Sequence, residues 1–241
     1  MARFVLIHGA FAGGWIWEPL AELLEAAGHT VEAPDLPGHG DDQTPVAEVT
    51  LDAYADRICA VVAGRPEPAT LVASSMGGIV ATQATARCGE RIAAIVYVAA
   101  FVPEDGQSLL DLTRLPEGEG DQTQANLVVE GDPPVATVPD EVTRRTAFAA
   151  CSDEVAAWAL PRRQAQPVVP FTQPVSLGGF DFAGIPRSYV LCKQDQSIPP
   201  PLQRRMLEAA GCSPVLELDT DHVPHLSRTV ELGEILERLA A

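Results

Sequence analysis

Short apolar runs alternate with amphipathic segments along most of this chain. Runs rich in apolar and β-branched residues and bounded by turn residues predict strands, and they lie at 4–8, 30–33, 69–74, 92–99, 187–192 and 214–218. The segments between them carry apolar residues at helical spacing and predict helices, at 15–27, 51–63, 76–88, 200–210 and 229–239.

The alternation of strands and helices predicts the fold class. Residues 92–99 are almost all apolar, which is typical of a strand buried on both faces of a parallel sheet. Strands that alternate with helices over short links indicate a doubly wound arrangement. We therefore expect an α/β fold with a mainly parallel sheet of about six strands.

The alternation stops at Pro103 and resumes near residue 185. Between them the pattern is irregular, with short helices expected at 109–115, 141–150 and 153–160, an extended Pro-rich stretch at 126–138 and turns at 161–174. An insertion of this length in a sheet connection usually forms a lid over the site. We expect a core made of 1–103 and 185–241, and a mostly helical lid at 104–184.

The composition excludes some classes of partner. The 241 residues include 16 Lys and Arg against 33 Asp and Glu, so the net charge is −17. This charge repels phosphate, and we expect neither nucleic acid nor a membrane surface as a partner. The longest apolar run, 92–102, is about half of the ~20 residues that a membrane span needs. The chain opens directly into a β-branched strand without a signal-peptide pattern, and we expect a cytoplasmic protein.

The five cysteines are odd in number and widely scattered. No pair has the spacing of a CxxC motif, so we expect reduced thiols, mostly buried as small apolar groups, and no structural disulfide. They are Cys59, Cys88, Cys151, Cys192 and Cys212.

A candidate nucleophile lies in the sequence Leu-Val-Ala-Ser-Ser-Met-Gly-Gly, between a predicted strand and a predicted helix. A nucleophile elbow needs small residues two positions before and after the nucleophile, because the tight turn brings them against neighbouring backbone. Ser75 has Ala73 and Gly77 at these positions, whereas Ser74 would have a valine and a methionine. The pattern predicts Ser75 as the nucleophile, with an ordinary Ser/Gly turn as the alternative.

The first predicted strand ends in His8 and Gly9. A sharp turn there directs backbone N–H groups into the space above the strand, where they can form an oxyanion hole with the N–H that follows the nucleophile. The expected donors are the backbones of Ala10 and Met76. His8 lies at the strand end, below this loop, and we expect it to be structural.

A candidate base and acid follow the last two predicted strands. The chain order Ser75, Asp195, His222 is that of hydrolases with a nucleophile elbow. Two alternatives remain, because Asp195 could be a solvated loop acid and His225 could be the base. We do not expect a metal site, since Pro224 interrupts the helix that would put both rings on one face and no third ligand is evident.

Together these motifs resemble the α/β-hydrolase superfamily, and within it the small esterases, hydroxynitrile lyases and plant methyl-salicylate esterases. The resemblance implies the α/β-hydrolase fold, with Ser75 as nucleophile, His222 as base and Asp195 as acid, and a structural role for His39. The resemblance covers nearly the whole chain. The matching segments are 4–10 with Trp15 and Trp17, the Ala-Pro-Asp-Leu-Pro-Gly-His-Gly signature at 33–40, the elbow at 75–78, the strand end at 99–103 and the segment around His222 at 221–227.

Three functions remain open. A serine at the elbow excludes relatives that use aspartate there, such as haloalkane dehalogenases and epoxide hydrolases. The first function is a cofactor-free serine hydrolase of a small, largely apolar ester, thioester or lactone. The second is a hydroxynitrile lyase with the same triad, and the third a ligand-binding receptor. In the lyases, the resemblance implies a threonine at the position of Gly9 and a lysine at that of Val223, so this chain favours the esterase.

The substrate pocket is expected from the lid and from the loops of the core. For each candidate the alternative is simple packing of the lid onto the core. No Arg or Lys is conspicuous near the elbow, so we do not expect a strongly anionic acyl group. The sequence does not decide between a monomer and a homodimer. The expected lining residues are Gly9, Phe11, Phe101, Leu109, Leu112, Phe148, Trp158 and Ile198.

Overall fold

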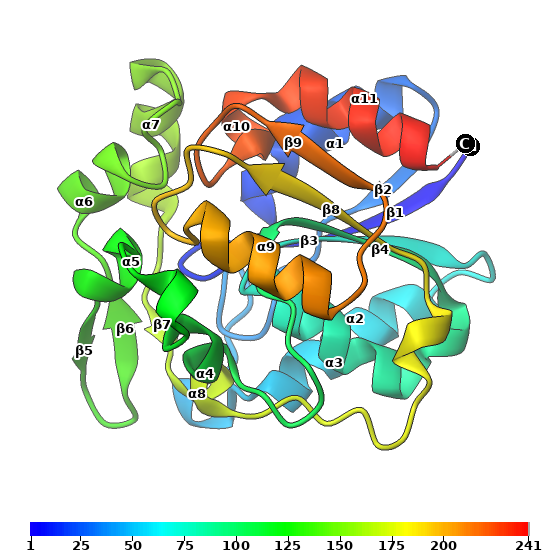
Figure 1. The fold of residues 1–241 in the computed structure, drawn as a ribbon, viewed down its shortest axis with the longest axis horizontal. Helices are drawn as coiled ribbons and strands as arrows, with labels where there is room; N and C mark the ends of the chain where they lie inside the picture. Colours follow the sequence, from blue (N-terminus) through cyan, green and yellow to red (C-terminus); the bar gives the residue numbers. More distant parts are fainter. Residues whose placement is uncertain (241) are drawn as a thin grey trace.

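A six-stranded parallel sheet forms the centre of the computed structural model, which describes residues 1–240 (Figure 1). The strand order is β2-β1-β3-β4-β8-β9, and all neighbours are parallel. The sheet confirms the predicted doubly wound α/β fold. The strands are β1 (Arg3–Ile7), β2 (Thr30–Glu32), β3 (Ala69–Ser75), β4 (Ile92–Ala100), β8 (Arg187–Cys192) and β9 (Val215–Leu218).

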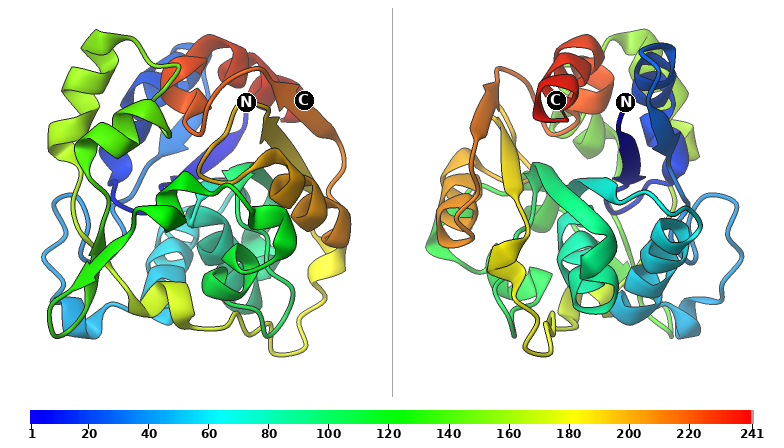
Figure 2. Two further views of the ribbon diagram at one scale, coloured as in Figure 1. Left: turned by 60° about the vertical axis from the view of Figure 1, so that its left-hand side comes forward. Right: turned by 90° about the vertical axis from the view of Figure 1, so that its right-hand side faces the viewer.

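Helices cover both faces of this sheet (Figures 1 and 2). In β1, Phe4 and Leu6 pack into one apolar cluster, and Val5 and Ile7 pack into another on the opposite face. Alternate side chains of a strand point to opposite faces, so a doubly covered strand must be apolar throughout. Within residues 1–240, no helix has the length and hydrophobicity needed to cross a bilayer. One face carries α1 (Glu18–Ala26), α10 (Pro224–Ser227) and α11 (Thr229–Leu239), and the other carries α2 (Leu51–Ala63), α3 (Gly77–Cys88) and α9 (Pro200–Ala209).

Most of the segment 104–184 lies at one side of the core, on the left in Figure 1, and its last residues, after 172, run along the bottom of the view toward the start of β8. It contains five short helices and also a three-stranded antiparallel sheet, which the sequence had indicated only as an extended stretch. Its elements are α4 (Leu109–Thr113), α5 (Gln122–Ala125), β5 (Val128–Glu130), β6 (Val135–Thr137), α6 (Asp140–Arg145), α7 (Asp153–Ala159), β7 (Gln166–Pro167) and α8 (Val169–Thr172). Short 3₁₀ helices lie at Gly14–Trp17, Val46–Glu48, Gly89–Arg91, Pro116–Gly118, Leu160–Arg162 and Phe182–Gly184.

One helix of this segment is shorter than predicted. The pattern favoured a helix over 141–150, but α6 ends at Arg145 and turns follow it. The N–H of Phe148 donates to the carbonyl of Thr143, five residues back, which is a typical bond of a helix end. The Arg144 guanidinium also donates to the Phe148 carbonyl at 2.7 Å. These bonds satisfy backbone groups that further helical turns would otherwise have used.

Three glutamines fasten the segment to the core. The Gln164 side chain accepts from the Gly40 N–H at 2.6 Å, and that of Gln166 donates to the Tyr54 hydroxyl at 3.0 Å. The side chain of Gln173, in the turn after α8, accepts from the N–H of Leu51, the first residue of α2, at 2.9 Å. The segment is therefore held against the core by directional bonds as well as by apolar packing.

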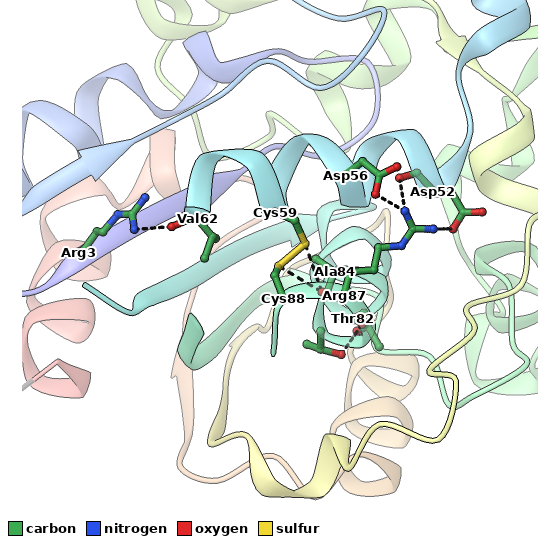
Figure 3. The surroundings of a disulfide bond; sticks show 10 residues. Arg3, Asp52, Asp56, Cys59, Val62, Thr82, Ala84, Arg87 and Cys88 are labelled. Carbon is green, nitrogen blue, oxygen red and sulfur yellow. Dashed lines mark hydrogen bonds and ion pairs between the residues drawn. A yellow bond between two sulfur atoms is a disulfide. The ribbon is translucent and has the colours of Figure 1, made fainter. Parts of the chain in front are cut away.

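The expectation of reduced cysteines throughout is wrong. Cys59 on α2 and Cys88 on α3 form a disulfide, with their Cα atoms 5.6 Å apart (Figure 3). The two cysteines are 29 residues apart in sequence, and only the side-by-side packing of the two helices brings them within bonding distance. The three other cysteines are free and buried, as expected. Reduced thiols were one reason to expect a cytoplasmic location, and with a disulfide present the cysteines no longer favour that compartment.

Candidate active site

Ser75 lies in a strained turn between β3 and α3. Its φ of 54° is in the left-handed region, which residues other than glycine rarely adopt and which often occurs at functional sites. A Cβ added to Gly77 would lie 2.6 Å from the carbonyl oxygen of Ile7. The turn therefore requires a glycine two positions after the serine, which is the geometry of a nucleophile elbow.

The loop after β1 lies directly against this turn. A Cβ added to Gly9 would lie 2.8 Å from Ser75 Cβ, so the loop reaches the serine only with bare backbone at this position. Phe11 also has a positive φ, 65°. Ala10 and Met76 line the same cavity as Ser75, and within residues 1–240 neither of their backbone N–H groups donates to another residue. Two backbone donors thus remain free beside the serine.

The loops after β8 and β9 bring Asp195 and His222 together. His222 Nδ1 lies 2.7 Å from Asp195 Oδ2, and Asp195 is 3% and His222 8% exposed. The other carboxylate oxygen accepts from the N–H groups of Ser197 and Ile198 at 2.7 and 2.9 Å. These bonds fix the orientation of the carboxylate toward His222. Because Asp195 occupies Nδ1, Nε2 of His222 is left for a further partner in the cavity.

The electrostatic surroundings keep His222 basic. Burial lowers its pKa, but the nearby carboxylates of Asp195, Asp221 and Asp121 raise it, and the net result is a pKa above the ordinary 6.5. Of these, Asp195 bonds the ring directly. A buried histidine beside an aspartate is typical of a catalytic base.

Asp221 joins the segment 104–184, the inserted segment, to the loop after β9 that carries His222, the histidine loop. It is fully buried, and its carboxylate accepts from the N–H of Ala150 at 2.7 Å and from the hydroxyl of Ser227 at 2.9 Å. Burial raises its pKa, against the effect of these hydrogen bonds. The residue before His222 is thus fixed from two sides, and the sequence indicated it only as part of a segment that resembles the family, without a role.

The cavity above the elbow is mostly apolar and has a volume of about 270 Å³. It contains Ser75, His222 and six of the eight residues expected in the pocket. These six are Gly9, Phe11, Phe101, Leu109, Phe148 and Ile198.

Leu112 and Trp158 do not line this cavity in the part of the chain that the structure describes. Leu112 is 2% exposed and packs inside an apolar cluster. The Trp158 ring packs edge-on against Trp15, with centroids 5.5 Å apart, and Arg162 lies over both rings. The sequence shows that such residues are large and apolar. It does not show whether they face the cavity or pack between the core and the segment 104–184.

Besides His222, three ionisable residues line the cavity wall, and the sequence indicated only one of them, His225, as an alternative base. Burial raises the pKa of Asp121 to about 6, against the effect of the N–H groups of Gln124 and Thr123. The other two are Arg163 and His225. Asp121 and Arg163 belong to no recognisable motif, and the position of the inserted segment brings them to His225 on α10.

The charge of Arg163 is balanced within the protein. Its guanidinium donates to Asp140 at 2.8 Å and to the Val138 carbonyl at 3.1 Å, and lies 5.4 Å from the centroid of the Phe11 ring. An arginine that already has a carboxylate and an aromatic ring as partners adds little attraction for an anion.

His8 and His39 hold loops rather than face the cavity. His8 Nδ1 donates to the Gly9 carbonyl at 2.8 Å, and its Nε2 accepts from the Leu36 N–H at 3.1 Å. The ring of His39 bonds the Tyr54 hydroxyl at 3.0 Å. Burial lowers the pKa of His8 to about 4 and that of His39 to about 3, so both rings are neutral near pH 7.

No group of three or more His, Cys, Asp or Glu side chains in residues 1–240 is arranged to hold a metal ion. His222 has Asp195 on one nitrogen, and His225 has no carboxylate or thiolate against its ring.

The parallel sheet, the strained serine turn after β3 and the apolar cavity above it define the α/β-hydrolase class of proteins. The chain matches the model of the Alpha/beta hydrolase family over residues 4–234, and it belongs to that family.

The relatives that match over nearly their full length include esterases and a lyase. The chain is 31% identical to Methylesterase 7 of Arabidopsis thaliana, with 99% of this chain and 96% of the relative covered. It is 29% identical to Alpha-hydroxynitrile lyase of the same plant, with 99% and 96% covered. The crystal structure of polyneuridine aldehyde esterase, an enzyme known from Rauvolfia serpentina, has a TM-score of 0.87, 26% identity and complete coverage of both chains. The chain is therefore an esterase-like α/β-hydrolase.

Proposed function

We propose that this protein is a serine hydrolase that cleaves small, largely apolar carboxylic esters. Ser75 is the nucleophile, His222 the base and Asp195 the residue that orients it. The observation that carries the proposal is the 2.7 Å contact between His222 Nδ1 and Asp195 Oδ2, in the wall of the cavity that also contains Ser75.

The reaction follows from these roles. With Nδ1 bonded to Asp195, His222 Nε2 takes the proton of Ser75 as the oxygen attacks the ester carbonyl. The resulting imidazolium gives this proton to the leaving alcohol, and an acyl-enzyme remains. Water then attacks the acyl group with His222 again as base, which releases the acid and restores the serine. No cofactor takes part in either step.

The free N–H groups of Ala10 and Met76 would bind the oxyanion of the tetrahedral intermediate. Each such donor contributes about 3 kcal/mol to stabilisation of the transition state. Because both are backbone groups in strained or tightly packed turns, they need no reorganisation when the charge develops.

The cavity supports a small and uncharged substrate. Its wall is mostly apolar, and its volume is about 270 Å³, near the lower end of the ~300–1,000 Å³ typical of ligand pockets. The Arg163 charge is balanced by Asp140. Esters with short aliphatic or single-ring groups suit such a site better than long acyl chains or carboxylated ones.

The lyase alternative lacks the groups it would need. Gly9 has no hydroxyl to bind a cyanohydrin oxygen, and a side chain there would collide with Ser75. Val223 lines the cavity and is 4% exposed, and an apolar side chain cannot stabilise a departing cyanide ion. An ester needs neither group, since its alcohol leaves with a proton from His222.

A panel of methyl and p-nitrophenyl esters with varied acyl groups, run beside mandelonitrile, tests the proposal. We expect turnover of at least one ester at ordinary enzyme rates, on the order of 10 per second, and little release of cyanide. Faster cyanide release than hydrolysis of every ester would instead make the protein a lyase. Turnover slower than minutes with tight ligand binding would favour a receptor.

Substitution of each of two neighbouring serines, Ser74 and Ser75, tests which one is the nucleophile. Ser75→Ala should lower kcat by at least about a thousandfold, because the members of a triad act as a unit, whereas Ser74→Ala should retain most of the activity. A serine-directed phosphonate should modify Ser75 in peptide mapping. An adduct on Ser74 would contradict the assignment.

A further inference from the structure

His225 is a buried histidine without a hydrogen-bond partner. The residue is 1% exposed, and within residues 1–240 neither nitrogen of its ring forms a hydrogen bond with another group of the protein. It lines the cavity that contains Ser75 and His222. Buried polar side chains nearly always have a partner, so this ring needs one that the protein itself does not supply.

The surroundings of His225 are apolar. Its ring packs on Trp17, with centroids 4.4 Å apart, and Ala12, Ile16 and Phe148 line the same cavity from the N-terminal loop and the inserted segment. Burial lowers its pKa to about 3, with a smaller contribution from nearby His222. The ring is therefore neutral near pH 7 and presents one N–H donor and one acceptor nitrogen.

Packing alone does not account for a histidine here. A phenylalanine or leucine would fill the space beside Trp17 without the loss of hydration that two unpartnered nitrogens entail. His222 already has Asp195 as its orienting group, so the proposed reaction does not use His225. What remains is a role toward the molecule that occupies the cavity.

We propose that His225 is a specificity-determining residue that binds an uncharged oxygen of the substrate, a hydroxyl, ether or carbonyl group additional to the scissile ester. The inference rests on the proposed esterase function and deepens it. A neutral ring with a donor and an acceptor matches such oxygens, whereas it cannot balance a full charge in apolar surroundings. The preferred substrates are then oxygen-bearing small esters rather than plain hydrocarbon ones.

The oxygen lies within a few bonds of the ester group. His225, in α10, lies three residues after His222, and both line one small cavity. Such an oxygen can belong to the acyl part or to the alcohol part of the ester. The chemistry of recognition is the same, and matched substrates distinguish the two.

The experiment compares matched esters on the complete protein. The acyl pair is methyl butanoate and its β-hydroxy analogue, and the alcohol pair is butyl acetate and methoxyethyl acetate. We expect the wild-type protein to prefer the oxygenated ester of at least one pair by about tenfold or more in kcat/KM. The pair that shows the preference tells which part of the ester carries the oxygen.

His225→Phe should reduce this preference to near unity, mainly through KM, because it retains the packing on Trp17 and removes both nitrogens. His225→Gln should keep part of the preference, since a neutral amide also donates and accepts. The readout is a ratio within each variant, so loss of folded protein cancels. His29→Phe is the matched control, since His29 lies outside the cavity, and it should leave the ratio unchanged.

The outcomes separate this inference from the proposed function. A wild-type ratio near unity in both pairs, or a preference that persists in His225→Phe, overturns the role of His225 while ester hydrolysis stands. If His225→Phe does not fold, the wild-type ratios and the His225→Gln variant decide. If no ester is hydrolysed, the proposed function fails, and the inference fails with it.

Discussion

Three carboxylates surround His222, and they differ in what holds them. Asp195 bonds the ring, and Asp221 bonds the inserted segment and the Ser227 hydroxyl. Asp121 lies in the cavity wall, where the N–H of Gln124 is 2.8 Å from its carboxylate. All three raise the pKa of the histidine, but only Asp121 can be changed without removing a bond to the histidine loop.

The pKa of His222 should be visible in the rate profile. A base must be neutral to accept a proton, and its pKa is raised above 6.5, so kcat/KM should begin to fall with decreasing pH at a value above 6.5. Asp121→Asn removes one of the charges that raise this pKa and should move the acidic limb to lower pH. The measurement is kcat/KM against pH on one ester.

The control for this profile is Asp181→Asn, which changes an exposed aspartate outside the cavity and should leave the limb in place. An identical limb in the wild-type protein and Asp121→Asn would mean that this carboxylate does not act on His222.

Asp121 should also make stability depend on pH. Its pKa is raised from 3.8 to about 6, so the native state binds the proton more tightly than the unfolded chain. Native stability then decreases as pH rises from about 4 to about 6, and the loss is complete above that window. Asp121→Asn should therefore gain stability over the wild-type protein as pH rises, by up to about 3 kcal/mol. Urea unfolding at the two ends of the window measures this. A pH-independent difference would contradict it.

At the scale of elements, α3 has a fixed position at both ends. It begins next to Ser75, where Gly77 packs against the backbone of β1. It ends at Cys88, which is bonded to Cys59 on α2, and Arg87 makes ion pairs with two aspartates of α2 (Figure 3). The disulfide thus joins two helices of the same layer and supports the helix that follows the elbow.

Removal of the disulfide should lower stability more than activity. Cys59→Ser with Cys88→Ser frees a loop of 29 residues in the unfolded chain, for which loop closure predicts a loss of about 3–4 kcal/mol. For a protein of this size we expect a decrease in Tm on the order of 10 °C, with kcat on a small ester changed little.

A reductant serves as the control for that variant. It should lower the Tm of the wild-type protein toward that of the double variant, which should itself be insensitive to reductant. If reductant leaves the wild-type Tm unchanged, the disulfide does not contribute to stability in solution.

On the scale of the whole molecule, the net charge of −17 should destabilise the folded state by self-repulsion. Screening lowers this repulsion, and we expect the Tm to rise by a few degrees between about 0.01 M and about 0.3 M NaCl. Glu234→Gln with Glu237→Gln removes two exposed negative charges of α11 and should make the rise smaller. A Tm that does not respond to salt would show that repulsion is not significant at this charge.

The sequence determined the fold because its signals are local. Apolar runs mark strands wherever both faces are covered, and β3 and β4 begin and end within one residue of the predicted bounds. The elbow was predictable for the same reason, since small residues around Ser75 reflect contacts made within one turn. Asp195 and His222 could be paired from their order after two strands, because parallel strands end at one edge of the sheet.

The tertiary structure decided what depends on distant segments. The Cys59–Cys88 bond needs two helices side by side, and the exclusion of Leu112 and Trp158 from the cavity depends on how the inserted segment sits on the core. Asp121 and Arg163 reach the cavity wall from a segment that no spacing relates to Ser75. A local pattern records which face of an element is apolar, but it does not record which other element covers that face, and the wall of a cavity is made by those long-range contacts.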